Sequence, residues 1–289
     1  SSELDQMFKI GDFIFRLQCE DKIVPPPNFM KFIYSPADDS GRKAEYCYDM
    51  RVSLELPVPV GKITAERPDL KVFQEGGLES RLIGVKGTPG YYACYQEKAL
   101  DRAEVILARD RLEGLHIDPV FTSLLALEKR LLGKDSLVLH CAYMEYRGEA
   151  ILFSAPSETG KTTQAALWEQ YRGSRTVNGD RSLLGKAGDR WMAQGWPVCG
   201  TSEVCFNEEL PIRAVVMLSQ AREDHAELLS PGKAFPLVYS QITVNRWNMN
   251  EHLRAMDLME DLLKNVPVYH LGCTISERAV ECLEDILGI

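Results

Sequence analysis

The chain has 289 residues, of which 45% are hydrophobic and 26% are charged. These fractions are typical of soluble globular proteins and exclude a disordered or fibrous chain. Its formal net charge of −9 argues against nucleic acid as the main partner, because phosphate backbones are bound by clustered Lys and Arg. We therefore expect an ordinary globular protein, and its length predicts two domains.

The sequence pattern contains no signal for a membrane span or for a structural zinc site. No apolar run approaches the roughly 18 residues that span a bilayer, and residues 1–15 alternate charged and apolar side chains in place of a signal-peptide core. We therefore expect a cytoplasmic protein that does not bind membranes. The eight cysteines are scattered without a C-x-x-C pair, which favours free thiols over disulfides or a structural zinc site.

The first part of the chain predicts a small β-rich domain covering residues 1–115. Short extended segments alternate there with turns rich in Pro, Gly and Asp, and helical periodicity is scarce. The expected strands are 13–17, 47–56, 82–85, 91–95 and 105–108.

The second part, residues 116–289, predicts alternating helices and strands. A helix with Asp118 as N-cap and Pro119 at its first position runs to Gly133, with Phe121, Leu124, Leu125, Leu131 and Leu132 on one stripe. Strands 137–144 and 150–153 follow, and the short turn between them requires antiparallel neighbours. Further along the chain we expect helices at 161–171, 250–264 and 276–287, strands at 175–178, 214–218 and 266–271, and a hairpin at 182–194; the segment 226–229 follows the strand at 214–218.

A phosphate-binding loop is predicted between the strand ending at Phe153 and the helix beginning near Lys161. This strand, loop and helix approximate the motif G-x-x-x-x-G-K-[ST], whose backbone N–H groups surround a polyanion. Two positions depart from it: Ala155 replaces the first Gly, and Glu158 adds a carboxylate that either weakens binding, faces solvent or helps to position a substrate or the lysine. The expected nucleotide-binding residues are Ser157, Glu158, Thr159, Gly160, Lys161, Thr162 and Thr163.

Individual residues of this loop suggest distinct roles. Gly160 lets the backbone approach the ligand, Lys161 reaches the outer phosphates, and the Thr162 hydroxyl can bind Mg²⁺. A second metal ligand is expected at the end of a neighbouring strand, and Asp180 follows strand 175–178, nineteen residues after the lysine. We therefore predict a metal site of Thr162 and Asp180, with Asp180 as a candidate proton acceptor.

Several segments resemble the HPr kinase/phosphorylase-like proteins, which share the nucleotide-binding core of phosphoenolpyruvate carboxykinases. The resemblance is carried by the runs His-Cys-Ala at 140–142, Ser-x-x-Gly-Lys-Thr at 157–162, Leu-Trp at 167–168 and Asn-Gly-Asp-Arg at 178–181. It continues through 195–201, 211–220 and Trp247, and so covers about residues 90–275. It implies a mixed α/β fold with an antiparallel-rich sheet around the phosphate-binding loop. The small β-rich domain that precedes this core is predicted from its residue pattern alone.

The resemblance also implies a serine-kinase-like enzyme that uses ATP and Mg²⁺. Its catalytic residues would be Asp180, Lys161 and His140, the histidine lying near the transferred phosphate unless it is a hydrogen-bonded core residue. In that family two adjacent aspartates follow the strand after the loop helix, whereas this chain has Gly179 and Asp180, which argues against a combined kinase and phosphorylase.

The sequence therefore predicts transfer of the γ-phosphate to a hydroxyl acceptor, either a peptide or protein serine or a small metabolite. A nucleotide-binding regulatory protein without turnover is the alternative, motivated by Glu158 and Gly179. Phosphoenolpyruvate carboxykinase activity has less support, because it needs a larger domain and further basic residues. Arg181 either contacts the nucleotide or acceptor or is an exposed cation, and the segment 196–201 either lines the acceptor pocket or is a packed loop.

Overall fold

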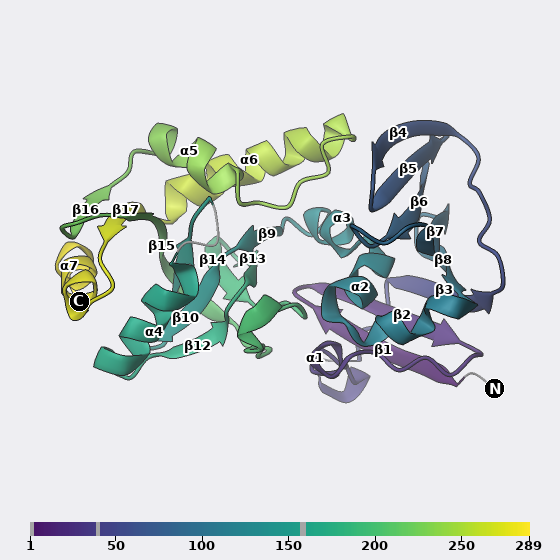
Figure 1. The fold of residues 1–289 in the computed structure, drawn as a ribbon, viewed down its shortest axis with the longest axis horizontal. Coiled ribbons are helices and arrows are strands. Elements are labelled where there is room, and N and C mark those ends of the chain that lie inside the picture. Colours follow the sequence, from purple (N-terminus) through teal and green to yellow (C-terminus); the bar gives the residue numbers. More distant parts are fainter. Residues whose placement is uncertain (1–2, 39–40, 157–159) are drawn as a thin grey trace. The chain divides into compact units, whose positions relative to one another are not determined.

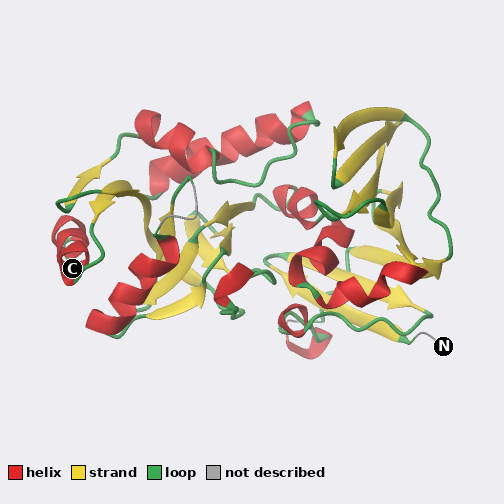
Figure 2. Cartoon of the chain, in the orientation of Figure 1, coloured by secondary structure: helices red, strands yellow, loops and turns green. Residues whose placement is uncertain are grey.

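A computed structural model describes residues 3–38, 41–156 and 160–289. It has a mixed α/β architecture with two separate sheets (Figure 2). Two compact units make up the chain, Ser1–Arg130 and Leu131–Ile289, and each is described by itself.

The chain divides fifteen residues beyond the predicted boundary at 115, because the segment after it packs into the first unit. The Tyr48 hydroxyl donates to the Leu125 carbonyl at 2.7 Å, and the Tyr92 hydroxyl donates to the Val120 carbonyl at 2.7 Å. Three of the predicted stripe residues, Phe121, Leu124 and Leu125, are fully buried in this unit, whereas Leu131 and Leu132 are buried beyond the division at Arg130.

The prediction of one continuous helix in this segment is wrong. It is divided into α2 (Asp118–Thr122), a 3₁₀ turn and α3 (Leu127–Leu132), because Ala126 adopts a left-handed conformation with φ of 50°. Asp118 is inside the first turn and does not cap it. Its carboxylate accepts a hydrogen bond from the Asn28 side chain at 2.8 Å.

The first unit is built on an eight-stranded mixed sheet in the order β1-β2-β3-β8-β7-β6-β5-β4 (Figure 1). All five predicted strands belong to it, but three others were not predicted. One of these, β4, has no buried residue, so its sequence lacks the alternation of apolar and polar residues that indicates a strand. The short helix α1 (Pro27–Met30) packs on this unit. The strands are β1 (Leu4–Ile10), β2 (Phe13–Cys19), β3 (Tyr46–Ser53), β4 (Lys62–Arg67), β5 (Leu70–Glu75), β6 (Leu78–Gly84), β7 (Tyr91–Ala99) and β8 (Arg102–Ala108).

An aromatic cluster and a buried charge network hold this unit together. The Phe29 ring lies 4.9 Å from both the Phe8 and Phe121 rings, measured between centroids. Elsewhere in this unit, the buried Arg81 guanidinium donates to Glu79 and Glu128, each at 2.8 Å. Since Glu128 belongs to α3, the network fastens this helix to the sheet.

The second unit is a three-layer α/β/α arrangement around a nine-stranded mixed sheet. One face is covered by α5 (Pro231–Tyr239) and α6 (Met249–Asn265), and the other by α4 (Lys161–Arg172) and α7 (Glu277–Leu287). Figure 1 shows the two pairs of helices on their separate faces. The strands are β9 (Leu137–His140), β10 (Ala142–Tyr146), β11 (Glu149–Ser154), β12 (Arg175–Asn178), β13 (Arg181–Ala187), β14 (Arg190–Gln194), β15 (Leu210–Gln220), β16 (His225–Leu228) and β17 (Val268–Cys273).

Three strands at the centre of this sheet are parallel. β11 pairs with β15, and β15 pairs with β17, both in parallel register. The carboxyl ends of parallel strands meet at one edge of a sheet, which is where ligands bind in α/β proteins. The chain leaves β11 at this edge and enters the predicted phosphate-binding loop.

The predicted hairpin before this loop is confirmed for β10 and β11, which are antiparallel. Arg147 and Gly148 between them have φ of 53° and 80°, as a two-residue hairpin turn of type I′ requires. The predicted strand 137–144 is wrong as one element, because it breaks at Cys141. Its first half, β9, pairs with β13, while β10 pairs with β11 and β12.

All eight cysteines are free thiols, as predicted, and six of them are buried. Across the described ranges, no helix is long and apolar enough to cross a bilayer.

Candidate functional site

Lys161 is the first residue of α4 and is largely buried. The residue before it, Gly160, has φ of +92°, a conformation that only glycine adopts readily. The first turn of α4 therefore presents backbone N–H groups and the Lys161 ammonium at the parallel-strand edge of the sheet. Ser157, Glu158 and Thr159 lie outside the described residues, so their predicted roles stay predictions.

His140 is fixed at the end of β9 by its backbone. Its N–H donates to the Gln241 carbonyl at 2.9 Å, and its carbonyl accepts from the Ser154 hydroxyl at 2.7 Å. Ser154 is fully buried at the end of β11, so one hydrogen bond ties the strand that leads into the loop to the histidine.

The three predicted catalytic residues lie together. His140 Nε2 is 3.1 Å from Asp180 Oδ1, and the Lys161 ammonium nitrogen is 3.0 Å from His140 Nε2 and 3.3 Å from Nδ1. An ammonium group only donates, and a neutral imidazole donates at one nitrogen and accepts at the other. When Nε2 donates to Asp180, Nδ1 accepts from Lys161 at 3.3 Å, and the 3.0 Å approach of the ammonium to Nε2 is then not a hydrogen bond.

Asp180 follows β12 and is held by its neighbours in the chain. The Asn178 side-chain oxygen accepts from the N–H groups of Asp180 at 2.8 Å and Arg181 at 2.9 Å. Burial raises the pKa of the Asp180 carboxyl, but the hydrogen bond from His140 and the positive charge of Arg181 outweigh this and hold it below its ordinary value. The group is therefore ionised at neutral pH, as a metal ligand or proton acceptor must be.

Arg181 lies at this site as well. Its Nε is 3.2 Å from Asp180 Oδ2, and its side chain is 37% exposed. The guanidinium therefore pairs with the carboxylate and still faces solvent, which leaves both predicted roles open.

The segment 196–202 packs against Asp180, and Asn178 connects the two. The fully buried Asn178 amide donates to the carbonyls of Trp196 at 3.1 Å and Val198 at 3.0 Å. A Cβ on Gly200 would lie 3.0 Å from the Asp180 Cγ. The segment is thus a packed loop that also borders the carboxylate.

Gly179 has no space for a side chain. A Cβ at this position would lie 2.2 Å from the Ser202 Cβ and 3.7 Å from the Thr162 Cγ2. Ser202 therefore fills the place that the first of two adjacent aspartates would need, and Thr162 lies beside the residue that precedes Asp180.

Thr162 is exposed and Thr163 is half-buried at the start of α4. Within residues 3–38, 41–156 and 160–289, no three His, Cys, Asp or Glu side chains form a group able to hold a metal. Mg²⁺ usually takes one or two protein oxygens and completes its shell with phosphate and water. Thr162 and Asp180 fit that demand.

Asn178, Ser154 and Ser202 were not predicted as site residues. Asn178 had a recognisable signal, because an Asn before Gly-Asp is typical of a side chain that hydrogen-bonds its own turn. Ser154 and Ser202 had none, since both act on residues distant in sequence. The other four histidines each have a hydrogen bond away from this site, in agreement with a structural role.

Comparison with known proteins gives one family and weak structural similarity. The chain is 9% identical to the HPr(Ser) kinase/phosphatase from Coxiella burnetii, with a TM-score of 0.32 over 52% of this chain and 95% of that one. No curated protein matches the chain. The model of one family, described as SynChlorMet cassette protein ScmC, matches residues 111–288, and the chain belongs to this family.

Proposed function

We propose that the second unit is an ATP- and Mg²⁺-dependent kinase that transfers the γ-phosphate to a hydroxyl group, on a peptide or protein serine or on a small metabolite. The observation that carries the proposal is the cluster of Lys161, His140 and Asp180 at the start of α4. It combines a buried cation, a glycine-led helix N-terminus and an ionised carboxylate at one edge of the sheet. The likeness of the motifs at 140–142, 157–162 and 178–181 to HPr kinase-like proteins supports the same conclusion.

Each residue has a defined part in this reaction. The Lys161 ammonium and the first N–H groups of α4 bind the outer phosphates, and Thr162 and Asp180 would hold the metal. A bound Mg²⁺ supplies charge neutralisation on the phosphate oxygens. Asp180 accepts the proton of the acceptor hydroxyl, and His140 Nε2 holds the carboxylate in position.

Transfer then depends mostly on positioning, as is general for phosphoryl transfer. The Lys161 ammonium lies 3.0 Å from His140 Nε2 at the first turn of α4, where its positive charge would meet the outer phosphates. The Asn178 side chain hydrogen-bonds both the Asp180 backbone and the segment 196–198, and so holds the two together. That segment would border the space where the acceptor approaches.

The proposal is tested by incubating the protein with ATP, Mg²⁺ and a panel of serine peptides and hydroxylated metabolites, and following phosphorylated product by mass spectrometry. We expect product with at least one class of acceptor. Tight ATP binding without product from any acceptor would instead support the regulatory alternative.

Replacement of Lys161 by alanine should weaken ATP binding by roughly 10- to 100-fold, as expected for a charged hydrogen bond to phosphate of about 1.5–3 kcal/mol. Calorimetric titration measures the change. The matched control is Lys233→Ala, an exposed lysine on α5 of the same unit, which should bind ATP like the wild type. Equal affinity of all three proteins would contradict the assignment of Lys161.

The regulatory alternative draws support from one specific feature, the space filled by Ser202 beside Gly179. A second carboxylate at 179 is excluded while Ser202 keeps its place. The site therefore operates with one aspartate, either as a kinase without the reverse activity or as a binding site without turnover.

The contact between Gly179 and Ser202 can be tested by substitution. Gly179→Ala brings its Cβ within 2.2 Å of the Ser202 Cβ, so it should lower the free energy of unfolding by about 1–3 kcal/mol, the usual cost of overpacking. Urea unfolding measures this, and the added change Ser202→Gly should restore most of the loss. Gly232→Ala, whose Cβ meets nothing within 4 Å, is the control; no rescue by Ser202→Gly would refute the contact.

A further inference from the structure

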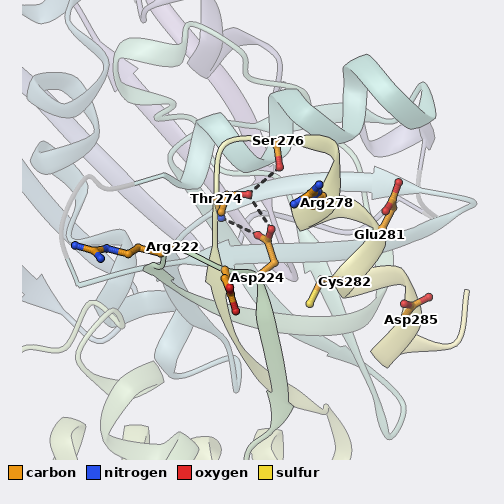
Figure 3. A pocket seen from close by; sticks show the side chains of 9 residues that line it. Arg222, Asp224, Thr274, Ser276, Arg278, Glu281, Cys282 and Asp285 are labelled. Carbon is orange, nitrogen blue, oxygen red and sulfur yellow. Dashed lines mark hydrogen bonds between the residues drawn. The ribbon is translucent and has the colours of Figure 1, made fainter.

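A pocket of about 680 Å³ lies beside α7 in the second unit. Its walls come from the loop after β15, the loop after β17 and one side of α7. Figure 3 shows Asp224, Thr274 and Ser276 joined by hydrogen bonds at one wall, with Cys282 projecting from the helix. The Asp224 carboxylate accepts from the Thr274 N–H at 2.7 Å and from its hydroxyl at 2.8 Å, which fixes this wall.

The pocket lies at the same edge of the sheet as the phosphate-binding loop. Arg222 and Asp224 follow the carboxyl end of β15, and Thr274 follows the carboxyl end of β17. Both strands are parallel to the strand that leads into the loop. A ligand whose phosphates lie at the start of α4 therefore reaches this pocket by extending along the edge, across two neighbouring strands of about 4.8 Å each.

One hydrogen bond connects the pocket wall with the phosphate-binding helix. The Gln164 side chain donates to the Thr274 carbonyl at 3.1 Å. Gln164 is one turn after Lys161 on α4 and is almost fully buried. The wall and the helix therefore form one connected structure.

The lining suits an uncharged polar group better than a polyanion. The lining contains two arginines, Arg222 and Arg278, and four acidic side chains, so it has an excess of negative charge; the acidic residues are Glu223, Asp224, Glu281 and Asp285. Guanidinium groups stack on flat aromatic rings, and carboxylates accept hydrogen bonds from sugar hydroxyls. The volume is also within the usual range for small-molecule sites, about 300–1,000 Å³.

A second pocket in the same unit has a volume of about 490 Å³. It is lined by Arg147, at the turn before β11, and by Arg172 and Gly173, at the end of α4. It therefore lies at the opposite edge of the sheet from the phosphate-binding helix terminus, and cannot receive the same ligand.

We propose that the pocket between α7 and the loop after β15 is the nucleoside subsite, which holds the base and ribose of the nucleotide whose phosphates bind at Lys161. The inference rests on the proposed function, because it needs nucleotide phosphates at the start of α4. The residues of this subsite would let the protein distinguish a nucleoside triphosphate from a polyphosphate without a nucleoside.

The test compares ATP with inorganic tripolyphosphate, which has the phosphates and lacks the nucleoside. Calorimetric titrations use the full chain and the variants Arg222→Ala and Arg278→Ala, with Arg147→Ala as the control of equal charge at the opposite edge. We expect each pocket variant to weaken ATP binding by about 3- to 30-fold, the range of cation–π contacts, and to leave tripolyphosphate binding unchanged.

The outcomes separate this inference from the proposed function. Wild-type affinity of both pocket variants for ATP, or equal losses for both ligands, would overturn the subsite while Lys161 still governs binding. Failure of the wild type to bind either ligand would overturn the proposed function and the subsite together.

Cys282 provides an independent measurement, since it lines the pocket and is half-buried. ATP should slow its alkylation by N-ethylmaleimide, followed by mass spectrometry, and tripolyphosphate should not. Cys47 in the first unit, the other half-buried thiol, is the internal reference. Equal alkylation rates of Cys282 with and without saturating ATP would also overturn the subsite.

Discussion

Replacement of Asp180 by asparagine is expected to lower the turnover number by about 10²- to 10⁴-fold, the usual contribution of a positioned general base. The amide keeps the size of the side chain and its contact with His140 Nε2, but it cannot accept the hydroxyl proton. Single-turnover phosphorylation of the acceptor found in the peptide and metabolite panel measures the effect.

The control for this variant is Asp189→Asn, an exposed aspartate in the turn between β13 and β14 of the same unit. It makes the same chemical change away from the site and should turn over like the wild type. Wild-type turnover in Asp180→Asn would show that the carboxylate is not the proton acceptor.

The second large effect is expected for stability, at the buried charge network of the first unit. Arg81→Met should lower the free energy of unfolding by about 3–5 kcal/mol, because it removes the guanidinium that pairs with the buried carboxylate of Glu79 and the half-buried carboxylate of Glu128. The Arg81 side chain is only 6% exposed and that of Glu79 is fully buried, so water cannot compensate either group. Urea unfolding of the full chain, followed by circular dichroism, measures the loss.

Arg16→Met is the matched control for this prediction. It breaks an ion pair with Asp5 at 2.7 Å, but both side chains are more than 40% exposed, and such surface pairs contribute about 0–1 kcal/mol. A similar loss in both variants would contradict the importance assigned to burial.

The parts of the fold with strong local signals were predictable from the sequence. The helix after the predicted phosphate-binding loop, the strand before Asp180 and the hairpin after it all agree with the structure. In each case a run of apolar periodicity ends at a glycine or a short polar turn, and no distant contact is needed to define it.

The remaining parts depend on contacts that sequence patterns do not contain. Residues 137–144 form one apolar run, but the chain turns at Cys141 because the Cys141 N–H donates to the Asp180 carbonyl at 3.0 Å. Ala126 adopts a left-handed conformation and breaks the helix predicted to begin at Asp118. Alanine rarely adopts this conformation, so its presence in the sequence does not predict the break.

The site shows the same division. The spacing between Lys161 and Asp180 indicated that both belong to one site, and the structure brings them together through His140. The contact of Ser202 with Gly179 and the amide bridge from Asn178 to Trp196 join residues 18 to 23 positions apart. These two contacts are visible only in the folded structure, because the residues that make them are far apart in the sequence.

The central claim is that the start of α4 binds the phosphates of a nucleotide. Calorimetric titration of the wild-type chain with ATP, with and without Mg²⁺, tests it most directly. We predict one ATP bound per chain, with higher affinity when Mg²⁺ is present because Thr162 and Asp180 then contribute to binding. Absence of ATP binding under both conditions would contradict the assignment of the phosphate-binding site.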